Sequence, residues 1–279
     1  MEADGKMAKV RGAFFLSDRT GITSETLGNM LLTQFAGVQF DRVTIPFINS
    51  LSKARDTVAR IDAYRERHGE PPLIFSTAVD DEIRAILATA DGVFMDFFES
   101  FIARLEDTLG VRASHSVGLA HGANPSTYHR RIEAVNFALA HDDGARMDHY
   151  AEADLILLAP SRCGKTPTCL YLALQHGLRA ANLPLTEEIL EAERLPEALT
   201  RFRSKLFGLT IDAERLAQIR SERLPNSRYA SREQCARELR LAQGIYRRLG
   251  APSLDTTHVS VEEIAAHIIH QMGLKSILR

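Results

Sequence analysis

The loop at residues 159–166 contains the residues that are best suited to chemistry. Its sequence, APSRCGKT, follows the apolar run 155–158 and precedes a segment with helical spacing, which is the context that a phosphate-binding P-loop requires. Backbone N–H groups at a helix N-terminus can wrap a phosphate, while Lys165 neutralises phosphate charge and Thr166 can ligate magnesium. The sequence therefore predicts nucleotide phosphates on this loop, which consists of Ala159, Pro160, Ser161, Arg162, Cys163, Gly164, Lys165 and Thr166.

The loop departs from the pattern G-x-x-x-x-G-K-[ST] at its first position, where Ala159 replaces glycine. The backbone there must avoid a positive φ or accept strain. The alternative interpretation is an ordinary strand-to-helix turn that contains Gly-Lys-Thr. Because a helix N-terminus lowers the pKa of a nearby thiol, we expect Cys163 to be sensitive to alkylation without being catalytic.

A group of arginines follows residue 210 and supplies a second set of candidates. Arg220, Arg223 and Arg228 carry guanidinium groups, which are suited to clamping a transferring phosphoryl group. We predict that one or two of these three bind phosphate. For most arginines of the segment the alternative is a solvated helix face.

The N-terminal segment 17–23, SDRTGIT, joins an apolar run to a helical pattern. Ligands of open α/β folds lie at such carboxyl ends of strands, and Asp18 is our candidate for the base that accepts a hydroxyl proton. The alternative is that Asp18 caps the helix that begins near Thr23.

Histidines and acidic residues cluster near the middle of the chain, at His121, His129, His141, Asp142 and Asp143. They invite a metal or acid–base interpretation. A histidine near a helix end is, however, more often a hydrogen-bonded or surface residue. We therefore assign no metal-binding residues.

The elements that must position these residues follow an alternating order, which predicts an α/β fold with mainly parallel sheets. A polar, glycine-containing stretch at 110–122 predicts the boundary between two lobes. These are an N-terminal parallel α/β lobe at 9–112 and a C-terminal P-loop kinase-like lobe at 113–279. We expect strands at 12–16, 43–48, 73–76, 93–97, 155–158, 205–211 and from 254, and a last helix from Val261 with Ser260 and Glu263 as its capping box.

Composition limits the classes of partner. The 279 residues have a formal net charge of -2, so the chain has no bulk attraction for nucleic acid or an anionic membrane. No apolar stretch is long enough to span a bilayer, and the N-terminus lacks a signal-peptide core. The three cysteines form no C-x-x-C pair. We expect a cytoplasmic protein.

Longer strings in the sequence resemble a known family. FFLSDRTGITSETLGNMLLTQF, HGANPSTYHRRIEAVNFALAHDDG, APSRCGKTPTCLYLALQ, KLFGLTIDAERLAQIRSERLPNSRYAS and LDTTHVSVEEIA are similar to the regulatory proteins of phosphoenolpyruvate synthase and of pyruvate, phosphate dikinase. The resemblance extends from about residue 12 to residue 270. Its SRCGKTPTCLYLALQ form resembles the phosphoenolpyruvate synthase branch.

The resemblance implies a bifunctional enzyme and a homodimer. Such an enzyme uses ADP to phosphorylate a threonine of phosphoenolpyruvate synthase, and inorganic phosphate to remove that phosphoryl group as pyrophosphate. ADP and phosphate are then substrates, Mg²⁺ accompanies them, and the ADP loop falls on 159–166 with Lys165, Thr166 and Asp18 as catalytic candidates. The alternatives are the same activity on pyruvate, phosphate dikinase, an ATP-dependent small-molecule kinase, and a nucleotide-sensing module that transfers nothing.

Overall fold

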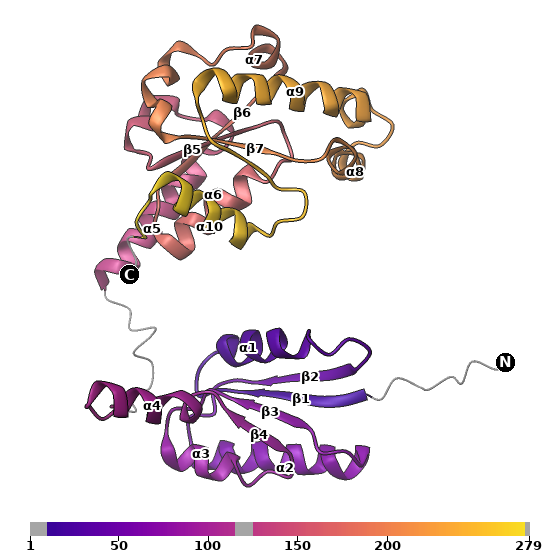
Figure 1. Ribbon diagram of the computed structural model, residues 1–279, viewed down its shortest axis with the longest axis vertical. Helices are drawn as coiled ribbons and strands as arrows, with labels where there is room; N and C mark the ends of the chain where they lie inside the picture. The colour runs from indigo at the N-terminus through magenta and orange to yellow at the C-terminus, as the bar shows by residue number, and fades with distance from the viewer. Residues whose placement is uncertain (1–9, 115–124, 277–279) are drawn as a thin grey trace, which may run out of the picture. The chain divides into compact units, whose positions relative to one another are not determined.

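The computed structural model describes residues 10–114 and 125–276. The chain divides into two compact units, Met1–Gly122 and Ala123–Arg279, and each unit contains one four-stranded parallel sheet covered by helices (Figure 1). The α/β class with two parallel sheets is therefore confirmed. The predicted lobes meet at residue 113, whereas the units divide at the end of the glycine-containing stretch 110–122.

The first unit has the strand order β2-β1-β3-β4. Helices α2 and α3 pack on one face of its sheet through a core that includes Phe14 and Ile74, while α1 packs on the other face against Phe15 and Phe75. The elements are β1 (Val10–Leu16), α1 (Ile22–Leu32), β2 (Gln39–Ile45), α2 (Leu51–His68), β3 (Leu73–Ser76), α3 (Asp81–Leu87), β4 (Val93–Asp96) and α4 (Glu99–Leu109).

The second unit has the strand order β6-β5-β7-β8. Figure 1 shows α5, α6 and α10 on one side of this sheet and α7 and α9 on the other. The elements are α5 (Pro125–Ala140), the 3-10 turns η2 (Asp142–Gly144) and η3 (Met147–Glu152), β5 (Leu155–Ala159), α6 (Lys165–His176), β6 (Ala180–Pro184), α7 (Glu187–Ala192), η4 (Glu197–Lys205), β7 (Leu206–Thr210), α8 (Ala213–Arg223), η5 (Arg228–Ala230), α9 (Arg232–Leu249), β8 (Ser253–Asp255) and α10 (Val261–Met272).

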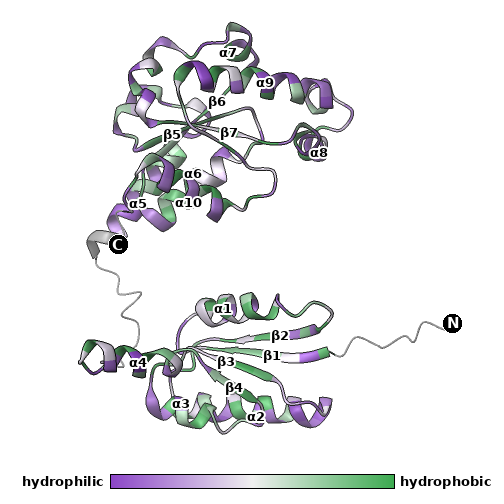
Figure 2. Ribbon diagram, viewed as in Figure 1, coloured by the Kyte–Doolittle hydropathy of each residue, from purple (hydrophilic) through white to green (hydrophobic). Residues whose placement is uncertain are grey.

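Strand β5 forms the centre of the second sheet. Its five residues are all fully buried, and it pairs with β6 on one side and β7 on the other. Figure 2 shows the strands as mainly hydrophobic and the helices as mixed. A continuous apolar run is typical of a parallel strand covered on both faces, and this prediction for 155–158 is confirmed.

Both sheets use the same strand order, with the first strand of the unit in the second position. In each unit this strand leads through a loop into a helix whose N-cap is a left-handed glycine, Gly21 (φ 82) in the first unit and Gly164 (φ 89) in the second. The residue that follows the glycine is Ile22 in the first unit and Lys165 in the second.

Most of the predicted elements are present within one or two residues. The capping box of α10 is confirmed, since Ser260 and Glu263 bond each other's backbone N–H groups. The strand expected at 43–48 is instead β2, which ends before Pro46. Strand β6 was not predicted. Within the described residues, no helix combines the length and the apolar character that crossing a bilayer requires.

Tyr246 of α9 connects the helix layer to the two central strands. Its side chain is buried, and its hydroxyl lies 2.9 Å from the carbonyl oxygen of Leu158 and 3.0 Å from that of Leu209. Burial raises its pKa well above the ordinary value, so it remains a donor. The ring passes over Gly208, where an added Cβ would lie 2.6 Å from ring carbons. Glycine is therefore required at this close approach.

We expect Gly208→Ala to lower the free energy of unfolding by about 1–3 kcal/mol, because the added methyl group overpacks the Tyr246 ring. The matched control is Gly244→Ala on α9, where the nearest atom to an added Cβ is 3.8 Å away. This control should stabilise by about 0.5–1 kcal/mol, since alanine is the better helix former. Denaturant unfolding of both variants checks the pair, and equal effects would contradict the packing argument.

Candidate functional site

The predicted phosphate loop joins the carboxyl end of β5 to the N-terminus of α6. Ala159 is the last residue of β5 and pairs with Pro184. It therefore has extended backbone, and the alanine that stands in place of the first glycine of the P-loop pattern does not need a positive φ. The N-cap Gly164 has no side chain to cap the helix. The N–H groups of Lys165 and Thr166, in the first turn of α6, therefore face no capping side chain and suit an anion.

Two loop residues have left-handed backbone, Arg162 (φ 73) and Gly164 (φ 89). Gly164 adopts this conformation without cost because it has no Cβ. Arg162 is not glycine, and a positive φ in a residue of this kind is strained. Its side chain is exposed. The loop therefore holds a backbone conformation that something other than the Arg162 side chain must maintain.

Lys165 is almost completely buried, with 5% of its surface exposed. Its ammonium group donates to the carbonyl oxygen of Pro160 at 3.2 Å, so the side chain folds back along the loop. Burial lowers the pKa of Lys165, and the neighbouring carboxylates Asp143 and Asp142 partly oppose this effect. The single lysine of the loop thus presents a charge with little water around it, which strengthens its interaction with an anion.

A polar cluster lies against the start of α6, and Asn182 is its one member that the sequence analysis did not single out. Thr166 donates to Asp142 Oδ1 at 2.8 Å, and the amide of Asn182 donates to the same oxygen. Asn182 is fully buried in the middle of β6 and also accepts from the N–H of Asp143 at 3.1 Å. Asn182 therefore fixes the turn that presents both carboxylates beside the loop.

Asp143 occupies the most exposed place in this cluster. Its backbone is left-handed (φ 49, ψ 38), which is uncommon for a residue other than glycine and is often found at functional sites. Its side chain is exposed, and its charge acts on Lys165. Asp143 therefore has a carboxylate beside the loop that is accessible to a substrate.

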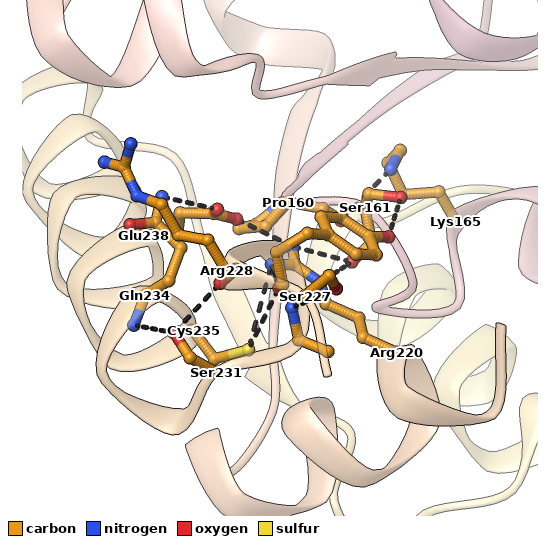
Figure 3. Close-up of polar contacts among 12 residues, drawn as sticks. Pro160, Ser161, Lys165, Arg220, Ser227, Arg228, Ser231, Gln234, Cys235 and Glu238 are labelled. Carbon is orange, nitrogen blue, oxygen red and sulfur yellow. Dashed lines mark hydrogen bonds and ion pairs between the residues drawn. The ribbon is translucent and has the colours of Figure 1, made fainter. Parts of the chain in front are cut away.

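Arg220 of α8 connects the loop to two helices (Figure 3). Its guanidinium donates to the carbonyl oxygen of Ser161 from Nη2 (3.1 Å) and Nε (3.4 Å). Nη2 also bonds Glu238 of α9 at 2.6 Å, and Nη1 bonds the carbonyl oxygen of Tyr229 at 3.0 Å. Arg220 is fully buried. Its guanidinium therefore contacts the backbone of the loop, and its direct contact with phosphate stays a prediction.

The other predicted residues of this region are placed differently. Arg223 ends α8 with an exposed side chain, and Arg228 forms an exposed ion pair with Glu187 at 3.6 Å. Their phosphate contacts remain predictions. Burial raises the pKa of Cys163 to about 12, so the expected sensitivity to alkylation was wrong: the helix N-terminus does not compensate for the loss of water.

Asp18 belongs to the first unit, and its proposed role as a base stays a prediction. Its side chain is 7% exposed and accepts from the N–H of Val79 at 3.2 Å. The alternative of a helix cap is not observed, because α1 begins after Gly21 without a side-chain cap.

Two of the candidate histidines lie among the described residues. His129 pairs with Glu133 at 3.2 Å, and the ring nitrogen Nδ1 of the buried His141 bonds the carbonyl oxygen of Phe137 at 2.7 Å. These contacts agree with the interpretation of hydrogen-bonded or surface residues. His121 lies outside the described residues.

A cleft of about 720 Å³ opens at the carboxyl ends of β7 and β8, between Asp212 at the start of α8 and the connection at Asp255 and His258. Its volume is within the range of small-molecule sites, about 300–1,000 Å³. Open parallel sheets bind ligands at this edge, and the same edge of this sheet carries the phosphate loop. The second unit therefore offers space for more than a phosphate.

Comparison with known proteins identifies the family. The model of the kinase/pyrophosphorylase family matches residues 13–269. The chain belongs to the kinase/pyrophosphorylase family. It is 54% identical over 270 residues to a protein of Ectopseudomonas mendocina (strain ymp). These residues are 96% of this chain and 99% of that relative.

Other relatives match a similar share of the chain. A protein of Marinobacter nauticus is 54% identical over 266 residues, with 95% of this chain and 98% of the relative covered. One of Hahella chejuensis is 51% identical over 270 residues, with 96% and 99% covered. All three bear the name "Putative phosphoenolpyruvate synthase regulatory protein". As a member of the kinase/pyrophosphorylase family, the chain is a phosphotransferase.

For this kinase/pyrophosphorylase we expect ADP affinity to fall as the pH rises through the pKa of Lys165. Because burial lowers that pKa from 10.5, the fall should begin at a lower pH than an exposed lysine would give. The Lys165→Arg variant keeps its positive charge over the whole pH range, since guanidinium does not lose its proton in proteins. The affinity of this variant for ADP should therefore not vary with pH in this range. Calorimetric titrations with ADP at increasing pH measure both proteins, and parallel curves would exclude Lys165 as the source.

Proposed function

We propose that the chain is a bifunctional regulator of phosphoenolpyruvate synthase. In one direction it transfers the β-phosphoryl group of ADP to a threonine of the synthase, which inactivates that enzyme. In the other it transfers the phosphoryl group from this threonine to inorganic phosphate and forms pyrophosphate. These relatives match 95–96% of the chain, and the name that they bear supports the choice of target.

The observation that carries the proposal is the burial of Lys165 against the loop backbone. Its ammonium group lies 3.2 Å from Pro160 O, and the charges of Asp142 and Asp143 act on it. A phosphoryl-transfer site needs cations for the spreading charge and a carboxylate that directs the attacking hydroxyl. The second unit supplies both.

In the kinase direction the β-phosphate of ADP lies on the loop, and its nucleoside extends toward the cleft at Asp212 and Asp255. Asp143 accepts the proton of the target hydroxyl as its oxygen attacks the β-phosphorus atom. The bond between this phosphorus atom and the bridging oxygen breaks, and AMP leaves. Lys165 and the N–H groups of the loop stabilise the negative charge during the transfer.

The loop also fits the magnesium ion that a nucleotide substrate brings. Thr166 Oγ1 and Asp142 Oδ1 lie 2.8 Å apart, and Mg²⁺ in such sites takes one or two protein oxygens together with phosphate oxygens and water. When bound, the ion neutralises phosphate charge. Thr166 and Asp142 would hold it, while Asn182 keeps the Asp142 carboxylate in place.

The reverse reaction uses the same groups. Inorganic phosphate occupies the loop, and one of its oxygens attacks the phosphorus atom of the phosphothreonine while the bond to the threonine oxygen breaks. Asp143 takes the proton that the attacking phosphate releases and passes it to the threonine oxygen, so that pyrophosphate and the free hydroxyl are formed. Both activities therefore depend on one site. The homodimer, the cytoplasmic location, and the alternative target pyruvate, phosphate dikinase stay predictions.

The first test combines ADP labelled on its β-phosphate with phosphoenolpyruvate synthase whose catalytic histidine carries a phosphoryl group. We expect label on a threonine of the target with the intact chain and none with Lys165→Ala, because the loop loses its buried positive charge. Mass analysis of the target locates the label. Transfer only from ATP to a small molecule would favour a small-molecule kinase, and binding without transfer would favour a nucleotide sensor.

A second test separates the two candidate bases. Asp143→Asn should reduce transfer in both directions by about 10²–10⁴-fold while ADP binding remains, since the amide cannot accept the hydroxyl proton. The control is Asp148→Asn, an exposed carboxylate on η3, which should leave both rates unchanged. If Asp18→Asn removes both activities and Asp143→Asn does not, the base belongs to the first unit.

A further inference from the structure

The conformation of the loop depends on one peptide group, the one that joins Ser161 to Arg162. Arg162 has a positive φ, and a residue other than glycine keeps this conformation only when its surroundings determine it. The exposed Arg162 side chain does not provide such surroundings. The restraint must therefore act on the backbone.

Arg220 provides that restraint through the carbonyl oxygen of Ser161. Two of its N–H groups point at this oxygen, at 3.1 and 3.4 Å. In a trans peptide the C=O and the following N–H point in opposite directions. When Arg220 holds the Ser161 carbonyl, the N–H of Arg162 is directed to the opposite side. Rotation of this peptide would exchange the two and turn a carbonyl oxygen toward an anion on the loop.

Each N–H group of the Arg220 guanidinium has an acceptor, and these contacts hold the side chain in place (Figure 3). Beyond the two contacts with Ser161, it bonds Glu238 at 2.6 Å, the Tyr229 carbonyl oxygen at 3.0 Å and the Cys235 sulfur at 3.8 Å. The Tyr229 ring covers the guanidinium at 4.2 Å. Five N–H groups thus meet acceptors, which is the whole donor capacity of an arginine.

The partners of Arg220 are fixed as well. Glu238 accepts from the Gln234 amide at 3.0 Å with its other oxygen. The Tyr229 hydroxyl donates to Ser161 Oγ at 3.0 Å, so Ser161 is held by both its carbonyl and its side chain. Arg220 therefore transmits the positions of α8 and α9 to one loop residue.

A contribution to stability alone is a weak explanation for this arrangement. Removing two charges from water costs free energy that their attraction only partly returns, and well-packed apolar residues often serve stability as well or better. A fork of directed donors, in contrast, can fix the orientation of a carbonyl group. The arrangement fits a demand for orientation.

We propose that Arg220, held by Glu238, is a positioning residue that orients the Ser161–Arg162 peptide so that the Arg162 N–H faces the bound phosphate. The inference rests on the proposed function, because it assumes that ADP and inorganic phosphate bind to this loop. It replaces direct contact between Arg220 and phosphate with control of the backbone that makes that contact.

The test is a pair of substitutions with a rescue. Arg220→Lys keeps the charge beside Glu238 but cannot donate as a fork, and it should raise the Kd of ADP and the KM of inorganic phosphate about tenfold, with a smaller change in kcat. Adding Arg162→Gly should restore most of this loss, because glycine adopts the positive φ without strain. A purely structural defect would not be rescued in this way.

The matched control is Arg237→Lys on α9, an exposed arginine paired with Glu191 at 3.2 Å, which should leave the Kd of ADP unchanged. If Arg220→Lys does not fold, Glu238→Gln loosens the same guanidinium and takes its place, with the same rescue expected. Unchanged affinity in both Arg220→Lys and Glu238→Gln, or failure of Arg162→Gly to rescue, would overturn the inference.

A crystal structure of Arg220→Lys separates this inference from the proposed function. A rotated Ser161–Arg162 peptide supports the positioning role whether or not ADP is a substrate, and an unchanged peptide overturns it. A wild-type chain that bound neither ADP nor inorganic phosphate would overturn the proposed function instead.

Discussion

The loop between β5 and α6 can hold a phosphate only if several backbone N–H groups point into the same space, and this requires left-handed backbone at Arg162 and Gly164. Glycine adopts that conformation freely, but arginine does not. Several contacts around the loop hold its backbone in this conformation. β5 fixes where the loop starts, and the Tyr246 hydroxyl bonds the carbonyl oxygen of Leu158, just before the strand ends. Arg220 holds the carbonyl oxygen of Ser161.

The charge of the site is local and partly dehydrated. The whole chain has a net charge of -2, yet the loop combines Lys165, Arg162 and the positive end of the α6 dipole. Burial of Lys165 makes its charge costly, as the lowered pKa indicates, and the same burial strengthens attraction to a phosphate. The carboxylates of Asp142 and Asp143 partly oppose this effect on the pKa, and in the proposed mechanism they supply the oxygen ligand and the proton acceptor. In the proposed mechanism a single arrangement therefore serves binding and transfer.

Local patterns in the sequence predicted what depends on neighbours along the chain. The run LILL predicted a buried strand, the string GKT predicted the start of a helix, and Ser260 with Glu263 predicted a capping box. Contacts between distant segments were not predictable in this way. Strand β6 was missed because its sequence, AANLP, is short and interrupted by Asn182 and Pro184.

Strand β6 also contains Asn182, a residue of the candidate site that the sequence analysis did not identify. Asn182 orients Asp142 and Asp143 across forty residues of chain, and a single sequence contains no signal for that pairing. Arg220 was selected for its chemistry, but its sequence position does not reveal that it is buried against Ser161 and Glu238. The same reason explains Cys163, whose proximity to a helix N-terminus is visible in the sequence and whose burial is not.

The two units share a strand order and a left-handed glycine at the same point, but they differ in the residue that follows it. Ile22 succeeds Gly21, whereas Lys165 succeeds Gly164. A lysine at this place neutralises phosphate charge, and isoleucine cannot. The carboxylate turn contacts the second loop through Thr166, and the Arg220 fork holds its Ser161 carbonyl oxygen. Charge, proton acceptor and backbone restraint thus occur together in the second unit, which is the reason to place phosphoryl transfer there and to test Asp18 separately.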